Sequence, residues 1–229
     1  MQPEPGDQEA DFLWGVATSA YQAEGGYNQP GQPRTNWAEA EERGDVALSG
    51  EAAGFWQRYS EDFARCRALG LNAFRLGIEW SRCHELDPAA IDHYASILRA
   101  CRTHGLEPVV TLHHFVHPAR LGPDPWLESS APELFAGYVR ELVARINAQL
   151  ARPIRWFITI NEPNMLVLNS YLGRQFPAQA RPGFDTIVRA YNQLLRAHIL
   201  AYRALHELYA ERGWVPPRVT FNNYCSDIY

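Results

Sequence analysis

The hydrophobic positions along the chain follow two spacings, one typical of buried strands and one typical of amphipathic helices. Short apolar and β-branched runs predict five strands, at residues 12–20, 74–80, 108–115, 156–162 and 218–224. Apolar residues that recur every three or four positions predict four helices, at residues 55–69, 88–104, 132–150 and 185–211. Strand and helix therefore alternate, with a loop rich in Gly and Pro at residues 25–34.

Several residues mark the expected helix ends. Asp87 followed by Pro88 predicts an N-cap with proline at the first helical position, and Gly105 predicts the end of the same helix. Cys66 and Cys101 fall on the apolar sides of two helices, which predicts small buried core residues.

Alternating apolar strands and amphipathic helices predict an α/β fold, a parallel sheet covered by helices. Both an open doubly wound sheet and a (β/α)₈ barrel satisfy this pattern. The first strand is not followed by Gly-x-Gly-x-x-Gly, which argues against a dinucleotide-binding sheet. Polar residues gather instead where strands end, and in a barrel these ends share one mouth. They are Gln22, Glu79, His114, Asn161, Glu162 and Asn223.

Composition and charge narrow the class of protein. The 229 residues fit one domain, and 46% hydrophobic with 21% charged residues is an ordinary globular composition. The net charge of −5, with dispersed basic residues, argues against a nucleic-acid partner. The polar start and the lack of a long apolar run predict a cytoplasmic protein with no membrane partner. The four cysteines form no Cys-x-x-Cys pair, so no zinc or redox site is indicated.

Glu162 is the leading candidate for a general acid. It closes an apolar strand, and an apolar site favours the protonated form of a carboxyl group. The alternative is that residues 161–163 are only a polar turn after a core strand, because three-residue motifs recur freely.

Four segments in order resemble glycoside hydrolase family 1, the β-glucosidase family. They are Phe-Leu-Trp-Gly-Val-Ala-Thr-Ser-Ala-Tyr-Gln at residues 12–22 with Glu24-Gly25, Phe-Arg-Leu at 74–76 with Glu-Trp-Ser-Arg at 79–82, Thr-Leu-His-His-Phe at 111–115, and Asn-Glu-Pro-Asn at 161–164. The resemblance extends from about residue 11 to the last residue. It implies a (β/α)₈ TIM-barrel type of fold, truncated to about the first five strands and four helices. The division expected is a polar tail at residues 1–10 and the first part of one barrel domain at 11–229.

The resemblance also implies an enzyme, a retaining β-glycosidase that hydrolyses terminal β-linked glucosides or galactosides without a metal or organic cofactor. Glu162 would be its acid/base, and Asn161 would bind the sugar 2-hydroxyl. Arg75 would support the nucleophilic carboxylate. Gln22, His114 and Phe115 would bind the substrate, a small β-glycoside or oligosaccharide.

Two of these residues have other interpretations. Arg75 could simply pair with Glu79 on the same strand face. His113, His114 and His117 could suggest a metal-dependent hydrolase, although adjacent strand residues point to opposite faces. His198 falls in a predicted helix and is interpreted as structural.

A retaining glycosidase needs a second carboxylate about 5–5.5 Å from the first. In the family it lies in a Thr-Glu-Asn-Gly-like motif on the seventh strand, and the sequence contains no such motif. Glu79 is a weak substitute. We therefore expect an incomplete barrel with exposed edges, which associates with itself or with a separate carboxy-terminal half. A non-catalytic or degenerate carbohydrate-binding protein is the alternative. The sequence does not indicate the sugar, a 6-phosphate preference or the oligomeric state.

Overall fold

A computed structural model describes residues 12–83 and 86–225 of the chain. The tail predicted at residues 1–10 lies outside the described residues. The described part forms one parallel sheet of five strands in the order β1-β2-β3-β4-β5. The strands are β1 (Gly15–Ala17), β2 (Ala73–Gly77), β3 (Glu107–Thr111), β4 (Trp156–Asn161) and β5 (Arg218–Asn222).

The strand order distinguishes between the two predicted architectures. A doubly wound sheet reverses its strand order at a switch point, whereas a barrel adds each new parallel strand beside the last. Here every strand pairs with the next one along the chain, from β1 to β5. The described residues therefore have the winding of a β/α barrel.

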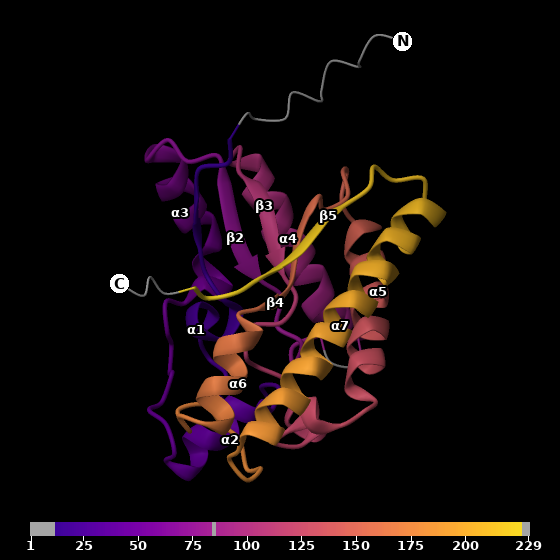
Figure 1. The fold of residues 1–229 in the computed structure, drawn as a ribbon. Helices are drawn as coiled ribbons and strands as arrows, with labels where there is room; N and C mark the ends of the chain where they lie inside the picture. Colours follow the sequence, from indigo (N-terminus) through magenta and orange to yellow (C-terminus); the bar gives the residue numbers. More distant parts are fainter. Residues whose placement is uncertain (1–11, 84–85, 226–229) are drawn as a thin grey trace.

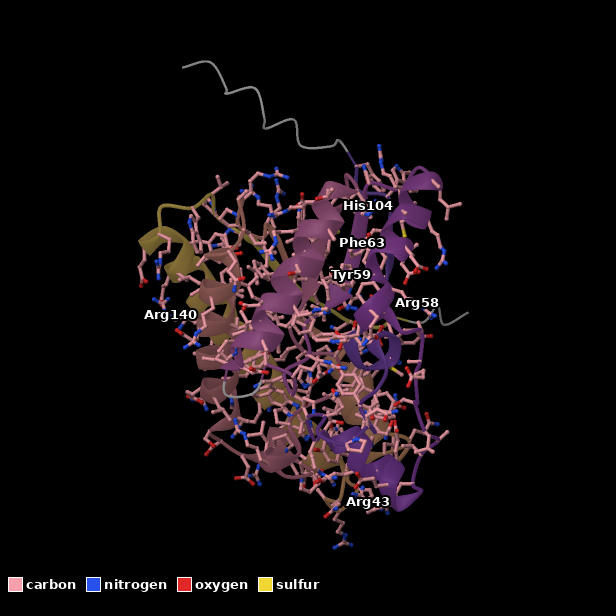
Figure 2. All side chains as sticks on the ribbon, turned by 180° about the vertical axis from the view of Figure 1, so that it is seen from behind. Arg43, Arg58, Tyr59, Phe63, His104 and Arg140 are labelled. Atoms are coloured by element: carbon pink, nitrogen blue, oxygen red, sulfur yellow. The ribbon has the colours of Figure 1, made fainter. Side chains whose placement is uncertain are left out.

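Four helices connect successive strands, as the sequence predicted. They are α3 (Phe55–Ala68), α4 (Pro88–Thr103), α5 (Ala131–Asn147) and α7 (Phe184–Glu211). Their apolar sides cover one face of the sheet, and α5 and α7 run side by side (Figure 1). In the view from behind, Tyr59 and Phe63 of α3 lie beside His104 at the end of α4 (Figure 2).

Several helix-end and core predictions are confirmed. The Asp87 side chain accepts a hydrogen bond from the Ala89 amide, with Pro88 as the first residue of α4. Gly105 follows that helix with a left-handed φ of 72°. Cys66 and Cys101 are buried, as is Cys83, whereas Cys225 is exposed.

The prediction of one strand over residues 12–20 is wrong. Only three of these residues pair with β2, and the chain then turns into a short helix, α1 (Ala20–Glu24). The Thr18 amide makes the last contact, donating to the Arg75 carbonyl at 2.8 Å. Two further helices, α2 (Asn36–Arg43) and α6 (Pro163–Tyr171), were also not predicted. All three helices lie beyond the carboxyl ends of the strands (Figure 1).

The two faces of the sheet differ in exposure. Leu76, Val110 and Phe157 occupy one row of the strand register and are buried under the helices. The row beside it, on the other face, contains Arg75, Val109, Trp156 and Arg218, and these residues are half-buried or exposed. The face that would line the inside of a barrel is therefore partly open.

Short 3₁₀ turns complete the connection between β3 and α5. They are η2 (Ala119–Leu121) and η3 (Pro125–Leu127). Within the described ranges, no helix is both long enough and apolar enough to cross a membrane.

Candidate functional site

The carboxyl ends of β2, β3 and β4 bring three polar side chains together. Arg75 of β2 donates through Nε to the Thr111 hydroxyl of β3 at 2.8 Å. Its Nη2 atom donates to Oδ1 of Asn161, at the end of β4, at 2.5 Å. Asn222 of β5 donates to the same Oδ1 atom at 3.1 Å. Four adjacent strands thus share one hydrogen-bonded cluster, which we call the Arg75 cluster.

An irregularity in β4 points Asn161 toward this cluster. Ile158 pairs with Thr220, and Asn161 pairs with Asn222, so three steps along β4 match two steps along β5. Side chains alternate between the faces of a regular strand, and one extra residue reverses that alternation. Thr159 points instead to the helix side, where its hydroxyl lies 2.8 Å from Nδ1 of His198 on α7. The structural role predicted for His198 agrees with this contact.

Glu162 follows directly and is half-buried. Its backbone has φ 41° and ψ 60°, a left-handed conformation that is uncommon for a residue with a side chain. The Glu162 amide donates to the Asn222 carbonyl at 2.8 Å, and its carbonyl accepts from Leu166 in the first turn of α6. Pro163 is the first residue of that helix. Backbone hydrogen bonds on both sides therefore hold the strained turn, which fixes the position of the Glu162 Cα atom and the direction in which its side chain leaves the backbone.

His114 and Phe115 follow β3 at the same end of the sheet. Burial, and secondarily the positive charge of Arg75, lower the pKa of His114 to about 3, so its ring is neutral near pH 7. The buried Nδ1 atom of His114 has no hydrogen-bond partner among the described residues. Phe115 contacts the His114 ring at a centroid distance of 4.8 Å and has a left-handed φ of 70°.

The segment after Phe115 is fixed by Asn36 at the start of α2. The Asn36 side chain donates to the Phe115 carbonyl at 3.4 Å and accepts from the His117 amide at 3.0 Å. Its own amide donates to the His117 carbonyl. Through Asn36, helix α2 thus fixes the position of the loop that carries the predicted site residues His114 and Phe115.

Gln22 lies on α1, and its side chain is exposed. Its Oε1 atom accepts a hydrogen bond of 2.5 Å from the Ser19 hydroxyl. Its side chain makes no hydrogen bond to the Arg75 cluster within the described part of the chain. α1 nevertheless packs on the end of β2, because a Cβ atom on Gly77 would lie only 2.7 Å from the Ala20 nitrogen.

Glu79 does not pair with Arg75, so this alternative is not supported. Its side chain is buried, and its Oε1 atom accepts from the Ser81 amide at 3.1 Å. The Glu79 amide donates to the hydroxyl oxygen of Tyr94, on α4, at 3.0 Å. Burial raises the pKa of Glu79 to about 7.

The three histidines considered for a metal site have different surroundings. His113 is buried with its ring 5.1 Å from that of Trp126, whereas His114 is near Arg75. His117 lies with Nε2 3.0 Å from the Gly122 carbonyl oxygen. The described residues contain no group of three or more His, Cys, Asp or Glu side chains arranged to hold a metal ion.

Three residues of the site were missed or misplaced by sequence reasoning. Thr111 lies inside the Thr-Leu-His-His-Phe motif, and nothing in the sequence gives it a role, because Arg75 is 36 positions away. Asn222 occupies the position predicted for Asn223, which is exposed. The role of Asn36 could not be predicted from the sequence, because its partners are far away along the chain. His117, for example, is 81 positions from it.

Known proteins share this arrangement of motifs and strands. The sequence profile of glycosyl hydrolase family 1 matches residues 6–222. A 6-phospho-β-galactosidase from Lacticaseibacillus rhamnosus is 35% identical over 194 residues, which are 82% of this chain and 40% of that protein. A 6-phospho-β-galactosidase 1 from Streptococcus pneumoniae is 32% identical over 86% of this chain and 42% of its own length.

Solved structures of glycosidases match the fold. A β-glycosidase from Pyrococcus horikoshii has a TM-score of 0.75 and 30% identity, over 86% of this chain and 45% of its own. A β-glucosidase from Thermotoga maritima has a TM-score of 0.79 and 26% identity, over 92% of this chain and 48% of its own. The chain thus spans less than half the length of each of these four proteins.

Proposed function

The chain belongs to glycosyl hydrolase family 1, and from that premise we propose that it forms the acid/base side of a retaining β-glycosidase. The substrate would be a small glycoside or oligosaccharide with a terminal β-linked glucose or galactose unit. The observation that carries the proposal is the Arg75 cluster, which lies directly beside Glu162 at the carboxyl ends of the strands.

Glu162 is proposed to give a proton to the glycosidic oxygen as the leaving group departs. In the second step the same carboxylate removes a proton from the attacking water. Both steps need the carboxyl group at a fixed place, and the turn at Glu162 provides it through the Asn222 and Leu166 backbone bonds.

Asn161 is proposed to bind the sugar 2-hydroxyl, a hydrogen bond that strengthens in the oxocarbenium-like transition state. Its Oδ1 atom already accepts two hydrogen bonds, from Arg75 and from Asn222. The amide is therefore oriented with its Nδ2 donor, which makes no hydrogen bond to another described residue, available for a substrate oxygen. Gln22 and the neutral ring of His114 are proposed to bind other hydroxyl groups, and Phe115 to contact the apolar side of the sugar ring.

Arg75 is proposed to support the nucleophilic carboxylate. Its guanidinium is half-buried and forms no salt bridge with a carboxylate of the described residues. A positive charge in such a place is stabilised by an opposite charge, so a second carboxylate fits beside it. The chain covers only 40–42% of the two curated relatives described above. We propose that a carboxy-terminal segment, equivalent to the rest of those proteins, supplies this carboxylate against the open edges β1 and β5.

The lack of a salt bridge between Arg75 and a carboxylate within the described ranges also favours one alternative. A chain that keeps Gln22, His114 and Asn161 but has no nucleophile would bind sugars without hydrolysing them. The two functions differ in whether a complementary segment restores turnover.

The test uses aryl β-glucosides and β-galactosides, each with and without a 6-phosphate. The chain is assayed alone and with a separately expressed segment that covers the remaining length of the L. rhamnosus relative, after co-elution of the two has been shown. Activity only in the complex, lost in Glu162→Gln and kept in the exposed-surface control Glu61→Gln, is the expected result. Activity of the chain alone would contradict the need for a second segment and point to Glu79. An inactive complex that binds the glycoside would favour the non-catalytic alternative.

A further inference from the structure

Gln22 lies on a helix that is too short to be stable by itself. The helix α1 has five residues, whereas isolated helices below about 12–15 residues are marginal in water. The only side-chain bond of Gln22 among the described residues is local, to Ser19. The position of the Gln22 amide group therefore depends on whatever holds the α1 backbone.

The last residue of α1 is a buried carboxylate with three hydrogen-bond donors. Glu24 is 1% exposed. Its Oε1 atom accepts from the Tyr94 hydroxyl at 2.6 Å, and Oε2 accepts from Arg82 Nε at 2.8 Å and from the Tyr27 hydroxyl at 2.5 Å. The donors come from α4, from the segment after β2 and from the segment after α1. One side chain thus ties α1 to three parts of the fold.

Arg82 is fixed as firmly as the carboxylate that it binds. Its Nη2 atom donates to the Gly25 carbonyl at 3.0 Å, and Nη1 donates to the Gln32 side chain at 2.8 Å. Its guanidinium lies 4.1 Å from the ring centroids of both Tyr27 and Trp56. Arg82 therefore holds α1 through the Glu24 side chain and through the backbone carbonyl of the next residue.

A buried ion pair is a poor source of stability, because both charges lose their hydration. Its geometry, in contrast, is well defined, since each partner accepts few alternative positions. The pair of Glu24 and Arg82 is thus better suited to fix the place of a short helix than to stabilise the whole fold.

We propose that Glu24 is a positioning residue, which places Gln22 for sugar binding through the bonds of its buried carboxylate to Arg82, Tyr94 and Tyr27. This inference rests on the proposed function, because it takes Gln22 as a sugar-binding residue. Glu24 acts through the α1 backbone and does not touch the sugar. A second attachment, from the Tyr21 hydroxyl to Glu41 of α2 at 2.8 Å, holds the residue on the other side of Gln22.

The first measurement is independent of any sugar. In Glu24→Gln, the α1 amide hydrogens should exchange at least tenfold faster, and the NMR signal of the Gln22 side-chain amide should shift or broaden. Glu42→Gln is the matched control, because Glu42 also binds an arginine, Arg34, but on the exposed surface. Unchanged α1 exchange and an unchanged Gln22 signal in Glu24→Gln would overturn the proposal.

The second measurement is a double-mutant cycle on binding of phenyl β-D-glucoside and its 6-phosphate. Gln22→Ala and Glu24→Gln should each weaken binding about tenfold, and the double variant should bind no more weakly than Gln22→Ala. Effects that multiply would overturn the proposal, since Glu24 would then act independently of Gln22. If the unaltered chain, alone and in the complex, binds neither compound, the proposed function fails, and α1 exchange still decides whether Glu24 positions the helix.

If Glu24→Gln does not fold, the more conservative variant Tyr94→Phe replaces it. Tyr94→Phe removes one hydroxyl from the carboxylate and keeps the ring, which packs against Trp56 at 5.2 Å between centroids. It should accelerate α1 exchange and perturb the Gln22 signal in the same direction, while exchange in α7 stays unchanged. Equal acceleration in α1 and α7 would indicate a general loss of stability and count against a positioning role.

Discussion

The Arg75 guanidinium donates a 2.5 Å hydrogen bond to the Asn161 side chain, although 86 positions separate the two residues. The bond spans β3, whose Thr111 accepts a second hydrogen bond from the same guanidinium. Residues from β2, β3 and β4 therefore meet at one point. A substitution at one of them should change a measurable property of its neighbours.

Removing the charge of Arg75 should change the titration of His114. The positive charge lowers the pKa of His114 in addition to the larger effect of burial, which together bring it to about 3. Arg75→Met should raise that pKa, but not to the usual 6.5, because burial remains. NMR titration of the His114 ring gives the value. Arg99→Met, on the exposed side of α4, is the control, and an unchanged His114 pKa in Arg75→Met would contradict the proximity of the two side chains.

Stability should fall as pH rises toward 7 because of Glu79. Burial raises the pKa of Glu79 from 4.5 to about 7, so the folded chain holds a proton that the unfolded chain releases. This contribution is fully present below pH 4.5, decreases as the pH rises to about 7 and is then lost, with a total on the order of 3 kcal/mol.

Glu79→Gln mimics the protonated acid and should remove that decrease. The measurement is urea unfolding of both proteins between pH 4.5 and 8, with the difference in unfolding free energy plotted against pH. The unfolding free energy of Glu79→Gln should increase relative to that of the unaltered chain between pH 4.5 and 8. A difference that stays flat would show that Glu79 does not titrate there.

Gly25 and Gly26 offer a matched pair for backbone strain. Both have φ 79°, but a Cβ atom on Gly25 would lie 2.1 Å from the Glu51 carbonyl oxygen, whereas one on Gly26 meets nothing within 4 Å. Gly26→Ala should cost about 1–2 kcal/mol from the left-handed backbone alone. Gly25→Ala should cost at least about 2 kcal/mol more, because backbone must also move. Equal costs by denaturant unfolding would argue against the close approach of Gly25 to Glu51.

The β1 edge should make the isolated chain associate. Phe12, Trp14 and Val16 are 62%, 64% and 44% exposed along this edge. Trp14→Gln should lower the associated fraction in sedimentation velocity, because it interrupts an apolar patch next to unpaired backbone groups. Leu69→Gln is the control, since Leu69 is 77% exposed at the end of α3. A monodisperse monomer of the unaltered chain would contradict this prediction.

The crossover helices could be predicted because each repeats one apolar face over several turns. The helices at the mouth could not be found in the same way. α1 has five residues and is ordered by contacts such as that of Glu24 with Arg82, which lies 58 positions away. For α6 a signal exists, since Pro163 is favoured at a first helical position, but the pattern that follows predicted no helix.

The candidate residues Arg75, Asn161 and Glu162 could be named from their motifs, whereas their bonding could not. Arg75 had a plausible partner in Glu79 on its own strand, and the structure gives it partners on β3 and β4 instead. Nothing in a local pattern specifies the register between neighbouring strands. Asn222 and Asn223 differ in role for the same reason, because pairing with β4 decides which of them faces inward.

The irregular pairing between Ile158 and Asn161 makes the site depend on how β4 pairs with β5 as well as on composition. If residues 158–161 paired regularly with β5, the Asn-Glu-Pro triplet would be unchanged, but its amide would point toward α7. Such a chain would pass any motif search and yet lack the bond to Arg75. Homologues are therefore best compared by the pairing of this strand, because the phase of the strand carries information that the letters alone do not.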